Sequence, residues 1–163
     1  MKRIPLLIAI LLTLNCTFAC ADWETLRSED NVYEYTRDGV ITAYYGDVIV
    51  TMPAEIDGTK INEIGVMACF DLDIHYLWVD EGIGLINTNA FEGSNLTYAD
   101  ISETVYNIGE RAFANCSELE EVALRSESIT FDKDVFAGTG YIQFDIPCTA
   151  DEKIMYDKIF AAK

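Results

Sequence analysis

The residues of this chain that carry reactive groups are few and scattered. His75 is the single histidine, and Cys69 is the cysteine closest to it in the sequence. Nucleophilic catalysis needs a thiol and a histidine base held side by side. The pair Cys69 and His75 is therefore the first chemical hypothesis, and it requires both side chains to lie on the same side of the fold.

Carboxylates are abundant, with 28 Asp and Glu residues against 11 Lys and Arg. Asp71-x-Asp73, Asp132-x-Asp134 and Asp80-Glu81 invite comparison with calcium sites, but none has the spacing of a calcium-binding loop. Gly138-Thr139-Gly140 is too short for a phosphate-binding loop. We therefore expect no catalytic site, no metal and no cofactor, and we interpret the acidic segments as solvated charge.

The elements that must position these residues repeat along the chain. Ala68-Cys69, Ala90-Phe91, Ala112-Phe113 and Val135-Phe136 follow one another at intervals of 22, 22 and 23 residues. In frames that start at Ile74, Leu96, Leu119 and Tyr141, apolar residues fall three and five positions further on, as a strand with one buried face requires. A core that recurs at this period indicates a solenoid, whose units are stable only when neighbours stack on them.

This register makes several predictions about the interior. It places strands near 77–79, 99–101, 122–124 and 144–146, one ladder of Phe91, Phe113 and Phe136, and another of Ile86, Ile108 and Phe131. Cys69 and Cys116 fall at interior positions and are expected to be buried and unbridged. His75 falls on the outward side, away from Cys69, which argues against a catalytic pair.

A glycine follows the isoleucine in two of the units, at Gly65 and Gly109, and Asn87 and Asp132 take its place in the others. Asn and Asp tolerate a positive φ better than most residues. The pattern therefore supports a tight backbone turn after the isoleucine, before the next segment of each unit.

The unit resembles the BspA-like leucine-rich repeat family, whose pattern reads Leu-x-x-Ile-x-Ile-Pro-x-x-Val-x-x-Ile-Gly-x-x-Ala-Phe-x-x-Cys. The match is closest at Leu96, Val105, Ile108-Gly109, Ala112-Phe113 and Cys116, and it extends in weaker form over 48–147. The resemblance implies a leucine-rich-repeat-like solenoid over residues 48–148, with short stacked parallel β-strands joined by irregular, turn or short helical returns. It also implies a secreted or surface bacterial protein without enzymatic activity.

The ends of the chain differ from the repeats. Residues 22–47 contain alternating apolar arms around Asp38-Gly39, which predicts an N-terminal β-hairpin cap. Residues 149–163 carry Ile154, Met155, Ile159 and Phe160 at near-helical spacing, which predicts a short C-terminal capping helix.

Residues 1–21 have the order of a secretory signal peptide, with Lys2 and Arg3 before an apolar run that is too short to span a bilayer. We expect cleavage after Ala21 and a mature chain without a transmembrane segment, secreted or held at the cell surface. The competing interpretation is a lipoprotein anchored through Cys20 or Cys16. The formal net charge of −17 repels phosphate backbones, which argues against nucleic acid as a partner.

The outward strand positions carry the functional hypothesis. Tyr76, Trp78 and Tyr98 should form one aromatic cluster on neighbouring strands, bordered by His75 and Asp100. Large aromatic groups exposed on a regular sheet indicate a contact surface for a protein or a glycan. The alternatives are cross-strand stabilisation of the sheet or cover by the N-terminal hairpin.

The sequence thus predicts a secreted, non-enzymatic leucine-rich repeat module that makes extracellular protein or glycan contacts, as in adhesion. The alternative is a structural envelope or spacer protein with no discrete ligand.

Overall fold

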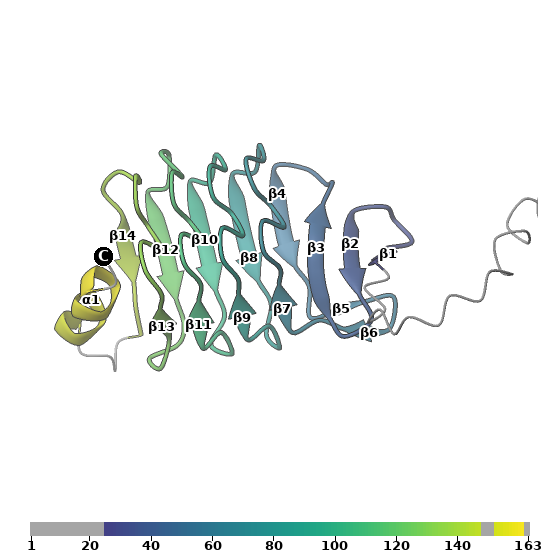
Figure 1. Ribbon diagram of the computed structural model, residues 1–163. Helices are drawn as coiled ribbons and strands as arrows, with labels where there is room; N and C mark the ends of the chain where they lie inside the picture. The colour runs from purple at the N-terminus through teal and green to yellow at the C-terminus, as the bar shows by residue number, and fades with distance from the viewer. Residues whose placement is uncertain (1–24, 148–151, 162–163) are drawn as a thin grey trace, which may run out of the picture.

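The computed structural model describes residues 25–147 and 152–161, which form a solenoid with one helix at its C-terminal end (Figure 1). One column of the solenoid is a five-stranded parallel sheet. Its strands are β4 (Ile49–Met52), β8 (Tyr76–Val79), β10 (Tyr98–Ile101), β12 (Glu121–Leu124) and β14 (Gln143–Asp145).

The second column is a seven-stranded sheet that begins with an antiparallel cap and continues with short parallel strands. Its strands are β1 (Thr25–Arg27), β2 (Tyr33–Thr36), β3 (Val40–Tyr44), β7 (Glu63–Ile64), β9 (Leu85–Ile86), β11 (Asn107–Ile108) and β13 (Thr130–Phe131). A separate pair, β5 (Glu55–Ile56) and β6 (Thr59–Lys60), forms a small hairpin around Asp57 and Gly58.

The predicted strand register is confirmed. Leu77 pairs with Ala99, Ala99 with Val122, and Val122 with Phe144 across the first sheet. Burial alternates along β4 and β8, because successive side chains of a strand point to opposite faces. The inward side chains form the core, and the outward ones are left for the surface.

The predicted interior ladders are also confirmed. The rings of Phe91 and Phe113 stack with centroids 5.3 Å apart, and those of Phe113 and Phe136 with centroids 5.6 Å apart. Ile86 and Ile108 are completely buried and pair in register with Phe131 along the second sheet. Cys69 and Cys116 are buried free thiols, as their places in the repeat predict.

The turns that lead from the second sheet back to the first form a third hydrogen-bonded column. The N–H of Phe91 donates to the carbonyl of Ala112 at 2.8 Å, and the N–H of Phe113 donates to the carbonyl of Val135 at 3.0 Å. Each of the turns before the last thus donates to the next turn along the chain. The direction of these bonds gives the column two chemically different ends.

The predicted turn follows Gly65, Asn87, Gly109 and Asp132, but none of these four residues has a positive φ. Left-handed residues recur two positions later instead, at Met67, Asn89, Arg111 and Asp134, and again at Asp71, Gly93, Asn115 and Gly138. Gly109 is needed for a different reason, because a Cβ there would lie 2.8 Å from the carbonyl carbon of Asn87. The glycine allows close approach of two backbones rather than an unusual dihedral angle.

The predicted N-terminal hairpin is confirmed as β2 and β3, with Gly39 at a φ of 91° in its turn. The third strand, β1, was not predicted. The cap also reaches the edge of the first sheet, because the hydroxyl of Tyr33 donates to the carbonyl of Thr51 at 2.6 Å. The hairpin itself extends the second sheet, so it does not cover the outward face of the first.

The predicted C-terminal helix is α1 (Glu152–Ala161). Ile159 is buried against the core, and the ring of Tyr156 meets that of Phe144 edge-on at 6.0 Å. No helix in the described part of the chain is long and apolar enough to cross a membrane. Three sequence predictions lie outside the described residues. They are the signal peptide at 1–21, the candidate lipid sites Cys16 and Cys20, and the start of the capping segment at 149–151.

Replacing Phe113 by Ala should lower the free energy of unfolding by about 3 to 5 kcal/mol, because it empties the middle of the aromatic ladder. The measurement is urea unfolding followed by circular dichroism. Phe70→Ala is the matched control, because Phe70 is an exposed phenylalanine. Equal midpoints for the two variants would contradict the ladder as a main source of stability.

A second prediction concerns Glu92, whose carboxylate accepts hydrogen bonds from Arg111 and Asn115 of the next turn and from Asn89 of its own turn. Chiefly the bond from Arg111 holds the pKa of Glu92 below its ordinary value of 4.5. A carboxyl group with a lowered pKa stabilises the fold above its unfolded pKa, and this contribution is lost as the pH falls through the folded value.

Wild type should therefore exceed Glu92→Gln in stability at pH 7, and the difference should shrink as the pH falls below about 4.5. Urea unfolding between pH 7 and pH 3 measures it. Glu118→Gln makes the same charge change at an exposed residue and should show no such narrowing. If the difference in unfolding free energy between wild type and Glu92→Gln stays constant over this range, the ion pair of Glu92 with Arg111 is not a pH-dependent source of stability.

Candidate functional site: the aromatic strand face

The predicted aromatic cluster forms on the outward face of the first sheet. Leu77 and Val79 point into the core, so Tyr76 and Trp78 on β8 must point outward. Their ring centroids lie 6.2 Å apart, and the ring of Trp78 lies 6.0 Å from that of Tyr98 on β10. We call these three residues, with His75 and Asp100 at their border, the aromatic face.

The aromatic face is open to solvent. Tyr76 is 44% exposed and Trp78 is 37% exposed, whereas Tyr98 is half-buried between its neighbours. Burial and the nearby negative charge of Asp100 raise the pKa of Tyr98, so its hydroxyl stays protonated at neutral pH. The rings also contact each other across strands, so the cluster contributes to the stability of the sheet as well.

Asp100 is held in place by a residue that the sequence reading did not assign to the site. Arg125 donates to both carboxylate oxygens of Asp100 at 3.0 Å and to Asp145 at 3.0 Å, which links three strands. The two carboxylates raise the pKa of Arg125 further above its already high value. Arg125 could have been found from the register, because Asp100 and Asp145 occupy the same place in their units.

His75 borders the aromatic face without joining a reactive cluster. Its Nε2 lies 3.2 Å from Oδ1 of Asp73, and Asn95 donates to the same oxygen at 2.9 Å. These two hydrogen bonds lower the pKa of Asp73. His75 therefore pairs with a solvent-exposed carboxylate.

The thiol of Cys69 is buried in the core, whereas His75 stands at the surface. The thiol is completely enclosed in the core, and this burial raises its pKa, so it stays protonated at neutral pH. No hydrogen bond joins Cys69 to His75 among the described residues. The geometry does not bring together the pair that nucleophilic catalysis would need.

The carboxylates that invited a metal site do not converge either. Within residues 25–147 and 152–161, no group of three or more His, Cys, Asp or Glu side chains is arranged to hold a metal ion. The pairs named from the sequence stand in exposed turns of separate units.

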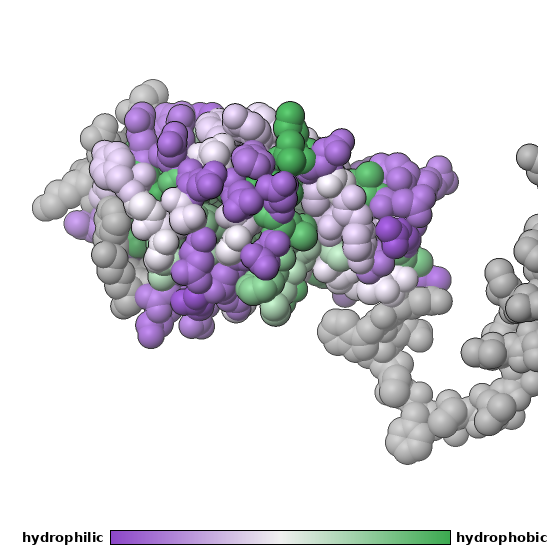
Figure 2. Space-filling view, turned by 90° about the horizontal axis from the view of Figure 1, so that it is seen from above, coloured by the Kyte–Doolittle hydropathy of each residue, from purple (hydrophilic) through white to green (hydrophobic). Residues whose placement is uncertain are grey.

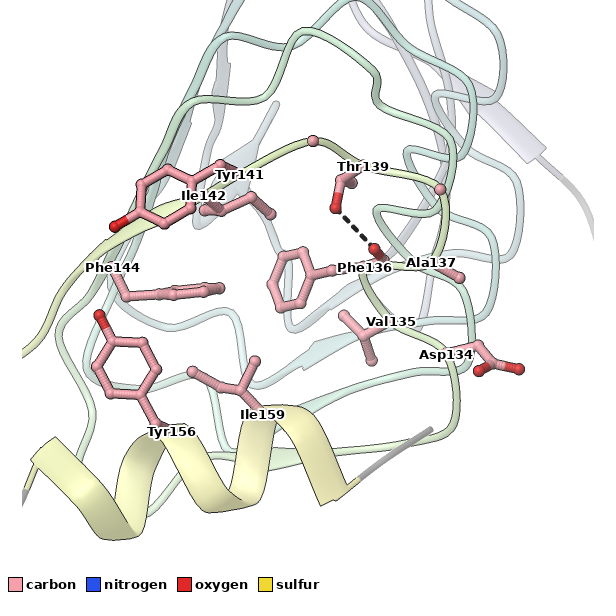
Figure 3. Close-up of a pocket in the computed structure, with 12 residues that line it drawn as sticks. Asp134, Val135, Phe136, Ala137, Thr139, Tyr141, Ile142, Phe144, Tyr156 and Ile159 are labelled. Atoms are coloured by element: carbon pink, nitrogen blue, oxygen red, sulfur yellow. Dashed lines mark hydrogen bonds between the residues drawn. The ribbon is translucent and has the colours of Figure 1, made fainter.

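A pocket of about 550 Å³ lies at the C-terminal end of the core, between the last turn and α1 (Figure 3). Val135, Phe136, Phe144, Tyr156 and Ile159 give it an apolar lining. Asp134 points away from its interior in the close-up view, and the hydroxyl of Thr139 donates to the carbonyl of Phe136 at 2.7 Å. The described lining of the pocket is therefore mainly apolar, with the hydroxyls of Thr139, Tyr141 and Tyr156 as polar groups beside the carboxylate of Asp134.

The stacked parallel strands, the one-sided core and the 22-to-23-residue unit define a leucine-rich-repeat solenoid. The sequence from 54 to 163 matches the family model for the BspA type leucine rich repeat region in six copies, and the chain belongs to this family.

Solved structures agree on the fold. A leucine-rich repeat protein from Bacteroides capillosus superposes with a TM-score of 0.64 at 22% identity, over 76% of this chain and 98% of that chain. A leucine rich cell surface protein from Faecalibacterium prausnitzii superposes with a TM-score of 0.55 at 19% identity, over 78% of this chain and 44% of that one. No curated protein sequence matches the chain.

Proposed function

We propose that this chain is a secreted or surface-exposed, non-enzymatic repeat module that contacts an extracellular protein or glycan through the aromatic face. The observation that carries the proposal is the exposure of Tyr76 and Trp78 on a rigid sheet. Rings fixed by the backbone of neighbouring strands lose little conformational freedom on binding, so their burial by a partner is favourable.

Three features support this assignment. The signal-like order of residues 1–21 is typical of export. The hairpin cap extends the other sheet and leaves the aromatic face open. In register, Ile49 lies beside Tyr76 and Thr51 beside Trp78, which continues the outward surface to the edge of the sheet.

Binding of residues 22–163 to a glycan array and to a panel of extracellular matrix proteins tests the proposal. The triple variant Tyr76→Ala, Trp78→Ala, Tyr98→Ala should weaken any detected interaction by at least about tenfold, which corresponds to roughly 1.4 kcal/mol. Tyr106→Ala with Tyr141→Ala is the matched control, because both rings are exposed outside the aromatic face.

Circular dichroism must first show that the triple variant is folded. If every interaction then survives in it, the aromatic face is not the binding site. If wild type binds none of the glycans or matrix proteins, the spacer function becomes the better explanation.

A further inference from the structure

The column of turns is incomplete at its N-terminal end. The chain passes from β7 to β8 through a full turn at 66–72, but it passes from β3 to β4 through the shorter segment 45–48. The cap therefore supplies strands to the second sheet without supplying a turn to stack on 66–72. The first turn of the column is left with an open side.

Backbone acceptors of the first turn lack the partner that a preceding turn would supply. The N–H groups of Met67, Cys69 and Asp71 donate to the carbonyls of Thr88, Ala90 and Glu92 at 3.3, 2.7 and 2.9 Å. The equivalent carbonyls in the first turn belong to Val66, Ala68 and Phe70, and none of them accepts a hydrogen bond from the described residues. Ala68 is buried, so only Val66 and Phe70 can offer their carbonyls to a partner. Open acceptors of this kind are the feature by which a strand edge recruits another backbone.

Exposed apolar side chains belong to the same turn as these acceptors. Val66, Met67 and Phe70 are exposed, and Val48 and Ile49 are exposed at the start of β4. Figure 2 views this side of the solenoid and shows a hydrophobic band between the hydrophilic turns of the later units and the N-terminal strands. We call the open carbonyls of Val66 and Phe70, with the side chains of Val66, Met67 and Phe70, the turn edge.

The later units do not share this character. Thr88, Asn89 and Glu92 stand at the positions of Val66, Met67 and Phe70. Met67 adopts a φ of 57°, which an Asn tolerates better than a Met. The first turn thus carries an exposed apolar residue at a position where folding alone favours a polar one.

The charges around the turn edge define its partner further. Asp47, Asp71 and Asp73 are exposed at its border, in a chain with a formal net charge of −17. A second copy of this chain would bring like charge to the same place, whereas a segment with flanking Lys or Arg would be attracted.

We propose that the turn edge binds an extended, apolar segment of a partner protein that carries basic flanking residues. Backbone N–H groups on one edge of the segment donate to the carbonyls of Val66 and Phe70, and its apolar side chains cover Val66, Met67 and Phe70. The segment takes the place of the missing turn. This surface is separate from the aromatic face and does not depend on the function proposed for it.

Short peptides selected from a random phage-displayed library on immobilised residues 22–163 are the probes. The selected sequences should combine an apolar centre with basic ends. N-methylation of alternate peptide nitrogens should weaken binding at least about tenfold for one set of positions and much less for the intervening set, because only one set donates to the turn edge. Peptides that tolerate every single N-methylation would overturn the proposal, and so would the selection of no binder.

The variant Val66→Thr, Met67→Asn, Phe70→Glu locates the site. It copies the residues of the next unit, Thr88, Asn89 and Glu92, so it should fold, and it should lose peptide binding. The triple variant of the aromatic face should retain it. Binding that survives in the first variant and is lost in the second would overturn the turn edge as the site.

Sedimentation of the wild-type protein without peptide tests whether a second copy of this chain binds the turn edge. A monomer at all concentrations is expected. A dimer that disappears in the Val66→Thr, Met67→Asn, Phe70→Glu variant would show that a second copy, rather than a partner protein, occupies the turn edge.

Discussion

The fold depends on stacking of units that cannot bury their own core. A strand of three or four residues has one inward face, and only the next unit covers its side chains. Phe113 lies between Phe91 of the preceding unit and Phe136 of the following one. Each unit therefore stabilises its neighbours, and the spacing of the inward residues must stay nearly constant.

The two ends of the stack lack a neighbour and are closed by different means. At the N-terminal end, β1 to β3 extend the second sheet. The hydroxyl of Tyr33 donates to the carbonyl of Thr51 on the open edge of β4. At the C-terminal end, α1 places Tyr156 and Ile159 under the last unit. The first turn is the place where neither device acts, which leaves the turn edge open.

The same constraint separates structural from functional positions. Inward residues are buried in the core, so they are not available to a partner. Polar turn residues such as Glu92 and Arg111 form hydrogen bonds that link one unit to the next. Outward strand positions and the first turn are free of these demands. The apolar residues found there, including Tyr76, Trp78 and Met67, are exposed without being needed to close the core.

The repeat, the strand register and the aromatic ladder can be read from the sequence, and so can the outward direction of Tyr76, Trp78 and Tyr98. Periods of two and of 22 to 23 residues fix which side chains share a face. Tertiary structure alone decided which sheet the hairpin joins, where the left-handed residues fall, and that Arg125 joins Asp100 to Asp145. The physical reason is that these features depend on contacts between neighbouring turns of the solenoid. A local sequence pattern shows which residues of one unit share a face. It does not show which side chains of the next unit will contact them.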